Sequence, residues 1–157
     1  RRITEGCRVL DMYASTGGVP GHAAAGGGHE VIAVADLPVV AGYGIERDRK
    51  GGHPKRNLNM MDEEVLNQLV NEGYPAGPGV LGENLIVEGV HLTDQPSGTL
   101  VRIGLDAVIE LIALREPCYK LTPLDPRMPD SVIGRVGMMA RVVEGGVVRV
   151  GDSVAVV

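Results

Sequence analysis

Large aromatic side chains are scarce in this sequence of 157 residues, which has no phenylalanine, no tryptophan and four tyrosines. Because proteins that bind single-stranded nucleic acid stack bases on aromatic rings, this composition argues against such a surface. The net charge of -5, with charges of both signs, also argues against a basic nucleic-acid-binding face. No apolar run is long enough to span a bilayer, and the first residues do not resemble a signal peptide.

Only two cysteines are present, Cys7 and Cys118, so the sequence has no disulfide framework of the secreted type and we expect a cytoplasmic protein. We also expect the two to lie too far apart for a disulfide. The sequence contains no P-loop, no dinucleotide-binding fingerprint and no G-x-S-x-G nucleophile motif. The histidines lack zinc-ligand spacing and are interpreted as surface residues of loops: His22, His29, His53 and His91.

The residues that are abundant favour a fold of many short strands, since 23 glycines and 10 prolines supply tight turns between valine-rich segments. We therefore predict an all-β protein, a closed or nearly closed β-barrel of short strands that forms a single domain over residues 1–157. The expected strands are 8–13, 29–40 with Pro38 at an edge or bulge, 84–88, 99–103, 106–114, 138–143, 147–150 and 153–157.

One α-helix is predicted, over residues 62–72. Asp62 is placed to cap its first turn and Gly73 to end it. Its apolar stripe, which should cover the barrel, consists of Val65, Leu66, Leu69 and Val70.

Cys118 follows the predicted buried strand 106–114, with Arg115 before it and Lys120 after it. Cationic neighbours lower the pKa of a thiol and favour the thiolate, the form that attacks sulfur or binds a soft metal. A cysteine is also a common small buried hydrophobic residue, so the local sequence leaves both interpretations open.

The segment 42–57 is polar and carries five basic residues, Arg47, Arg49, Lys50, Lys55 and Arg56. A charge-dense loop of this kind is commonly a solvated surface. It also suits an anion-binding loop, because glycines let a ligand approach the backbone and arginine forks match phosphate geometry.

Several short motifs, taken in order, resemble the MOSC domain, the family named after the C-terminal domain of molybdenum cofactor sulfurases. The resemblance is strongest from Gly42 onward and weaker at Gly17-Gly18-Val19-Pro20. Its motifs are Gly44 to Arg49, Gly82-Glu83-Asn84-Leu85, Arg115-x-Pro117-Cys118-x-x-Leu121, Gly134 to Gly137, and Glu144-Gly145-Gly146 to Gly151-Asp152.

The resemblance implies a β-barrel and a functional role for Cys118, as a persulfide carrier or as the ligand of molybdenum in a pterin cofactor. A thiolate is a suitable soft ligand for that metal. The residues expected to bind the cofactor, with basic side chains for its phosphate, are Arg47, Arg49, Lys50, Arg56, Glu83, Asn84 and Arg115. For Glu83 and Asn84, hydrogen bonding within their own turn is slightly favoured over ligand contact.

Three functions follow as hypotheses. The first is binding of the molybdenum cofactor with an oxotransfer or reductive reaction, for which a redox partner protein and a small-molecule substrate are expected. The second is a sulfur carrier with a persulfide on Cys118, charged by a pyridoxal-phosphate-dependent cysteine desulfurase. The third is a non-catalytic binding barrel, motivated by departures from the family pattern: Arg47 replaces a glycine and Lys50 replaces a histidine.

The first hypothesis carries a geometric expectation. Arg49 or Arg56, the turn 82–84 and Cys118 should open onto one cleft. Cys118 should be accessible or covered only by a mobile segment such as 23–28 or 122–131, because a thiol sealed in apolar packing is inert.

Overall fold

The protein is described here by a computed structural model that covers residues 7–16, 30–48, 51–54, 56–117 and 119–157. It has few helices: α1 (Glu63–Asn71), α2 (Met128–Ser131), and the 3-10 turns η1 (Leu92–Asp94) and η2 (Tyr119–Leu121). The strands are β1 (Arg8–Thr16), β2 (Glu30–Ala33), β3 (Asp36–Val40), β4 (Gly44–Ile45), β5 (Leu58–Asp62), β6 (Leu85–Glu88), β7 (Leu100–Ile103), β8 (Ala107–Leu114), β9 (Met138–Glu144), β10 (Gly146–Arg149) and β11 (Val154–Val156).

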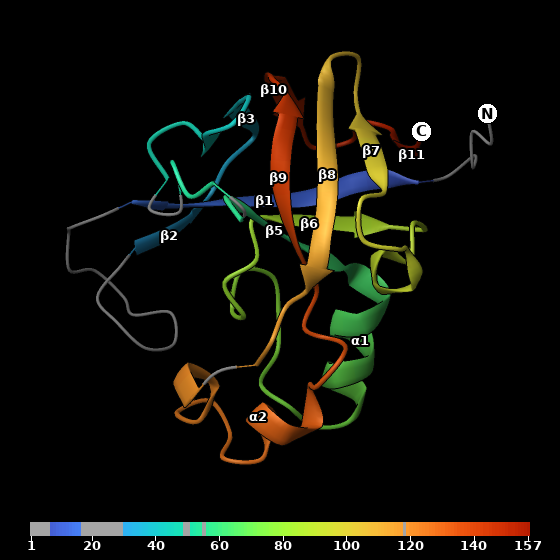
Figure 1. Cartoon of the computed structure of the whole chain (residues 1–157). Helices are drawn as coiled ribbons and strands as arrows, with labels where there is room; N and C mark the ends of the chain where they lie inside the picture. The colour runs from blue at the N-terminus through green and yellow to red at the C-terminus, as the bar shows by residue number, and fades with distance from the viewer. Residues whose placement is uncertain (1–6, 17–29, 49–50, 55, 118) are drawn as a thin grey trace.

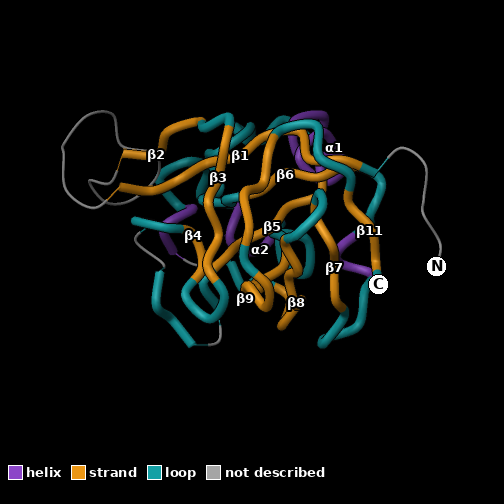
Figure 2. Tube along the Cα trace, turned by 90° about the horizontal axis from the view of Figure 1, so that it is seen from above, coloured by secondary structure: helices purple, strands orange, loops and turns teal. Residues whose placement is uncertain are grey.

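Eight strands form one sheet in the order β11-β7-β8-β9-β5-β6-β1-β2, and β10-β3-β4 form a smaller sheet beside it. The large sheet curls until β1 meets the segment that leads into β11 (Figures 1 and 2). There the N–H of Val9 donates to the carbonyl of Asp152 over 2.9 Å, and Gly151 donates to the carbonyl of Val9 over 2.8 Å. These bonds bring the sheet to a nearly closed barrel, which confirms the all-β prediction.

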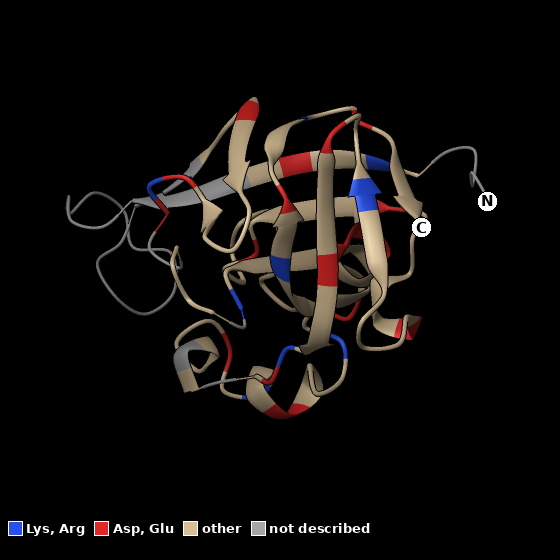
Figure 3. Cartoon of the chain, turned by 45° about the horizontal axis from the view of Figure 1, so that its top comes forward, with Lys and Arg blue, Asp and Glu red and all other residues tan. Residues whose placement is uncertain are grey.

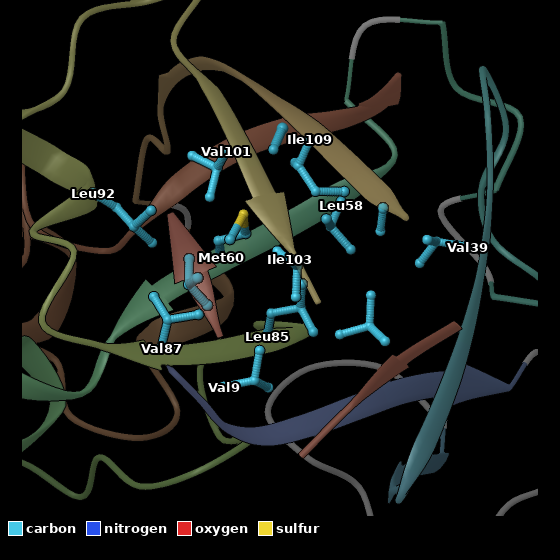
Figure 4. Packing of buried hydrophobic residues seen from close by; sticks show 14 of the residues in the cluster. Val9, Val39, Leu58, Met60, Leu85, Val87, Leu92, Val101, Ile103 and Ile109 are labelled. Atoms are coloured by element: carbon cyan, nitrogen blue, oxygen red, sulfur yellow. The ribbon is translucent and has the colours of Figure 1, made fainter. Parts of the chain in front are cut away.

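The barrel interior is filled by aliphatic side chains that converge from the surrounding strands (Figure 4). Val9, Leu58, Leu85 and Ile109 have no exposed surface, and Cys7 lies in the same cluster. Burying this apolar surface supplies most of the drive for folding, and small branched side chains fill the space that aromatic rings occupy in other cores.

A second apolar cluster lies outside the barrel, between α1 and the segment that follows η2. Leu66 and Leu69 of α1 are buried in it, as predicted, whereas Val70 is 49% exposed and lies outside the contact stripe. From the segment after η2, Met128 and Val132 are fully buried in the same cluster. The predicted helix is therefore confirmed as a cover, but it covers a loop segment together with the sheet.

The predicted side-chain cap of α1 is wrong. Asp62 occupies the N-cap position, but its side chain makes no capping bond. Its Oδ1 instead accepts the N–H of Leu92, over 3.0 Å, at the start of η1. The buried side chain of Asp62 thus connects the end of β5 to the turn after β6 by a hydrogen bond.

Strand β5 is absent from the sequence predictions although it lies in the middle of the sheet, antiparallel to β9 and parallel to β6. Met60 faces the barrel cluster and Met61 faces the second cluster. A strand with both faces buried does not alternate between apolar and polar residues, so its period is hidden.

The remaining strand predictions are confirmed to within a few residues, except that the segment 29–40 contains two strands, β2 and β3. Pro38 pairs with Val147 of β10, while the pairing of β3 with β4 begins only at Val39. On the other side of β3 the carbonyl of Pro38 accepts the N–H of Glu46 over 3.0 Å, so Pro38 lies between two hydrogen-bonded segments and not at an edge of the small sheet. Among the described residues, no helix has the length and apolar character needed to cross a membrane. Charges of both signs are spread along the described ribbon (Figure 3).

Candidate functional site

A cleft of about 800 Å³ opens on the outer face of the barrel, between the polar loop and the end of β8. Its volume lies within the range of roughly 300–1,000 Å³ that is common for ligand sites. The residues that line it are Gly51, Gly52, His53, Pro54, Arg56, Asn59, Ala113, Leu114, Arg115, Glu116 and Met139.

The floor of the cleft is a row of residues from three adjacent strands. Asn59 of β5 pairs with Met139 of β9, and Met139 pairs with Ala113 of β8. All three are half-buried, whereas their neighbours Leu58 and Met138 face the barrel cluster. Because successive side chains of a strand point to opposite faces, this row lies on the outside of the barrel.

One wall of the cleft is the glycine pair Gly51-Gly52, which lies against the ring of Tyr43. A Cβ added at Gly51 would stand 2.5 to 2.8 Å from Cε1, Cζ and the hydroxyl oxygen of Tyr43, and the N–H of Gly52 donates to the carbonyl of Tyr43 over 2.7 Å. A larger residue at position 51 would push aside the end of the Tyr43 side chain, which is 41% exposed. The wall therefore exposes backbone, to which a ligand can come close.

The same loop carries His53 and Arg56, which are tied to each other and to the barrel. The N–H of Arg56 donates to Nδ1 of His53 over 3.2 Å, and Nη1 of Arg56 lies 3.6 Å from Sδ of Met139. The side chain of fully buried Asn57 donates to the carbonyl of His53 over 3.3 Å and accepts the N–H of Val142 over 3.2 Å. These contacts hold an exposed cation and an imidazole at the rim of the cleft.

The opposite wall begins where β8 ends. The N–H of Arg115 donates to the carbonyl of Gly137 over 2.8 Å. The half-buried side chain of Arg115 runs along the Gly82 backbone, where an added Cβ would lie 3.4 Å from its Nη2 atom. Arg115 and Arg56, 59 positions apart in the sequence, therefore line one cleft.

Glu83 and Asn84 lie behind the cleft and do not line it. Both side chains are 2% exposed. Oε1 of Glu83 accepts the N–H of Gly79, and burial raises the pKa of Glu83, although nearby backbone N–H groups and the positive charge of Arg115 act in the opposite direction. Asn84 is bonded to the backbone of Asn59. Their described contacts are with the turn and the cleft floor.

The other predicted site residues are placed differently. Arg47 is exposed and does not line the cleft. Its φ of 61° is a left-handed conformation that favours glycine, the residue of the family pattern at this position. Arg49, Lys50 and Cys118 lie outside the described residues. No group of three or more His, Cys, Asp or Glu side chains suited to a metal occurs within the described ranges.

Sequence reasoning missed three polar residues of the cleft, His53, Asn59 and Glu116. His53 was interpreted as an ordinary surface histidine. Asn59 lies in the strand that was not predicted. A signal was present for His53, because it belongs to the same glycine-containing basic loop as Arg56. For Asn59 no such signal existed, since its place depends on the pairing of β5 with β9.

The sequence profile of the MOSC domain matches residues 47–155, which include both walls and the floor of the cleft. The chain belongs to the MOSC domain family. The profile spans the motifs from Gly82 onward that carried the resemblance, and the Gly17–Pro20 motif lies outside the described residues. No curated protein matches the sequence significantly.

Several solved structures share the fold of this chain. YuaD from Bacillus subtilis superposes with a TM-score of 0.73 at 18% identity, over 94% of this chain and 93% of its own. YiiM from Geobacillus stearothermophilus gives a TM-score of 0.70 at 20% identity, over 96% of this chain and 75% of its own. YiiM from Escherichia coli gives a TM-score of 0.68 at 24% identity, over 96% of this chain and 69% of its own. At these identities the fold is what the proteins are shown to share.

Proposed function

We propose that this MOSC protein binds the molybdenum cofactor in the cleft between the polar loop and Arg115, and uses it in an oxotransfer or reductive reaction. The observation that carries the proposal is the presence of Arg56 and Arg115 on one cleft of ligand size. Two arginines that line one cleft suit the phosphate of a pterin cofactor, because a guanidinium group can donate two parallel hydrogen bonds to phosphate oxygens.

The cleft residues suit the rest of the cofactor as well. The backbone at Gly51-Gly52 can approach a planar ring closely, and Ala113 and Leu114 supply an apolar surface for it. Cys118, two residues after the lining residue Glu116, is proposed as the soft thiolate ligand. When bound, the cofactor supplies a molybdenum centre that exchanges an oxygen atom with a change of two electrons.

The chain's own residues would then have separate tasks. Arg56 and Arg115 bind the anionic end of the cofactor. The cationic Arg115 also favours the thiolate form of a cysteine three residues later. A redox partner protein would supply electrons, and we propose a cytoplasmic location, in which the thiol stays reduced.

The test is reconstitution of the purified protein with cofactor released from a donor protein, followed by measurement of bound molybdenum and of pterin fluorescence. Wild type should retain both. Cys118→Ser should lose molybdenum, and Arg115→Gln should lower affinity for the whole cofactor by about tenfold or more, since a hydrogen bond to a charged group contributes roughly 1.5–3 kcal/mol. Arg149→Gln, on β10, is the matched control and should bind as wild type does.

Equal molybdenum content in wild type and Cys118→Ser would overturn the proposal. The sulfur-carrier function is separated from it by incubating the same proteins with a cysteine desulfurase and cysteine. A persulfide on Cys118 in a protein that retains no molybdenum would favour the carrier. If the protein retains no molybdenum and Cys118 gains no sulfur, the remaining hypothesis is that the protein is a non-catalytic binding barrel.

A further inference from the structure

Asn59 is the polar residue of the cleft floor, at the β5 end of the row that it forms with Met139 and Ala113. It pairs with Met139 in the row that crosses β5, β9 and β8, and its half-buried side chain lines the cleft. Its neighbours in β5, Leu58 and Met60, have at most 1% of their surface exposed, inside the barrel. A polar side chain at this place lies beneath whatever ligand the cleft receives.

The Gly82–Asn84 turn holds Asn59 at three points. The backbone N–H of Asn59 donates to Oδ1 of Asn84 over 3.0 Å, and its carbonyl accepts the N–H of Asn84 over 2.8 Å. Its side-chain Nδ2 donates to the carbonyl of Gly82 over 3.4 Å. The third bond orients the carboxamide, because it determines which end of the amide is directed to the turn.

The cleft has few side-chain acceptors. Arg56 and Arg115 can only donate hydrogen bonds. Nδ1 of His53 already accepts the N–H of Arg56, and Sδ of Met139 is in contact with the Arg56 guanidinium. Among the described lining side chains, the remaining strong acceptors are Oδ1 of Asn59 on the floor and the carboxylate of exposed Glu116.

We propose that Oδ1 of Asn59 accepts a hydrogen bond from the N–H edge of the cofactor's heterocycle, and that the Gly82–Asn84 turn acts on ligand binding through Asn59. The inference rests on the proposed function. In this arrangement the two arginines of the cleft bind the phosphate. Asn59 selects a ring that carries N–H donors. The buried turn is a positioning element for this contact.

The experiment compares two probes on the purified apo-protein. One is the molybdenum cofactor released from a donor protein, and the other is glycerol phosphate, a phosphate monoester without a heterocycle. Affinities come from equilibrium dialysis, with retained pterin fluorescence for the first probe and competition against the cofactor for the second. Asn59→Ala should weaken cofactor binding about two- to tenfold and leave glycerol phosphate binding unchanged, because a neutral hydrogen bond contributes roughly 0.5–1.5 kcal/mol.

Comparison variants separate ligand contact from a loss of structure. Arg115→Gln should weaken both probes, and Asn67→Ala, at an exposed position of α1, should change neither. If Asn59→Ala does not fold, Asn59→Ser, which keeps a hydroxyl beside Gly82, should show the same difference between the probes. Asn84→Ala, which loosens Asn59 without replacing it, should show a smaller loss for the cofactor alone.

Wild-type affinity for the cofactor in the Asn59 variants would overturn this inference and leave the proposed function standing. An equal loss for both probes would also overturn it, since that outcome indicates collapse of the cleft. A wild-type protein that binds no cofactor would overturn the proposed function together with the inference.

Discussion

Asn59 and Asn84 are joined by a reciprocal pair of hydrogen bonds, from the N–H of Asn59 to Oδ1 of Asn84 and from the N–H of Asn84 to the carbonyl of Asn59. The pair lies directly before the parallel ladder of β5 and β6, which begins with Met60 and Leu85. The side chain of Asn84 thus extends the hydrogen bonding between β5 and β6 by one residue pair. It links the buried turn to the floor of the cleft.

Asn84→Ala should lower the free energy of unfolding by about 1–3 kcal/mol, because the N–H of Asn59 loses its acceptor in a partly buried place. Urea unfolding followed by circular dichroism measures the change. Asn67→Ala, on the exposed side of α1, is the control and should stay within about 0.5 kcal/mol of wild type. Equal stability of the two variants would contradict the role given to Asn84.

Gly51→Ala should displace the glycine wall, because the added Cβ would stand 2.5 to 2.8 Å from Cε1, Cζ and the hydroxyl oxygen of Tyr43. Because Tyr43 is 41% exposed and its ring can turn toward solvent, we expect a loss of no more than about 1 kcal/mol in stability, together with weaker cofactor binding. Thermal unfolding and equilibrium dialysis measure the two effects.

The second variant for this wall is Gly51→Ala combined with Tyr43→Ala. Removing the ring should make the glycine substitution nearly neutral, so the double variant should be more stable than the sum of the single changes predicts. Gly77→Ala is the matched control, since its Cβ would make only an ordinary contact of 3.8 Å with Val80. Strict additivity of the two changes would refute the contact.

Arg47→Gly should raise the free energy of unfolding by a few tenths to about 1 kcal/mol. A left-handed backbone costs a residue with a Cβ roughly 1–2 kcal/mol, and this gain exceeds the roughly 0.5–1 kcal/mol that glycine's chain entropy costs. Arg47→Val should lower stability, because a β-branched residue tolerates φ of 61° poorly. Chemical unfolding of both variants measures the two effects. Equal stabilities of Arg47→Gly and Arg47→Val would show that the φ of residue 47 does not determine the stability.

Asp62→Asn should change how stability depends on pH. Burial raises the pKa of Asp62, against the hydrogen bond from Leu92, so the folded protein binds this proton more tightly than the unfolded chain does. The stabilisation from Asp62 is therefore complete below the unfolded pKa of about 3.8 and is lost as the pH rises through the higher folded value. Asparagine keeps an acceptor for Leu92 and carries no charge.

Relative to wild type, Asp62→Asn should therefore have a higher free energy of unfolding at pH 7 than at pH 4. Urea midpoints at the two pH values measure it. Glu46→Gln, at an exposed carboxyl, provides the comparison. A difference that moves the other way would show that Asp62 is stabilised as a carboxylate in the folded protein.

Local pattern was enough to predict most of the barrel. Strands such as β8 and β9 have apolar runs of strand length bounded by turn residues, and α1 has helical spacing with Gly73 after its last turn. Each of these signals depends on neighbours in the chain, so each can be recognised without a partner. The ordered motifs around Gly82–Asn84 and Cys118 indicated the MOSC family on the same basis.

The sequence by itself determined the strand-rich fold, the family and the cationic loop, because these follow from residue type and short-range order. Only the tertiary structure decided which residues share the cleft. Asn59, Met139 and Ala113 meet because β5, β9 and β8 are adjacent in one register, and Arg56 joins Arg115 because the polar loop closes over that row. Such contacts depend on strand pairing between distant segments, and a register shift of one residue would turn Asn59 into the barrel and Leu58 outward.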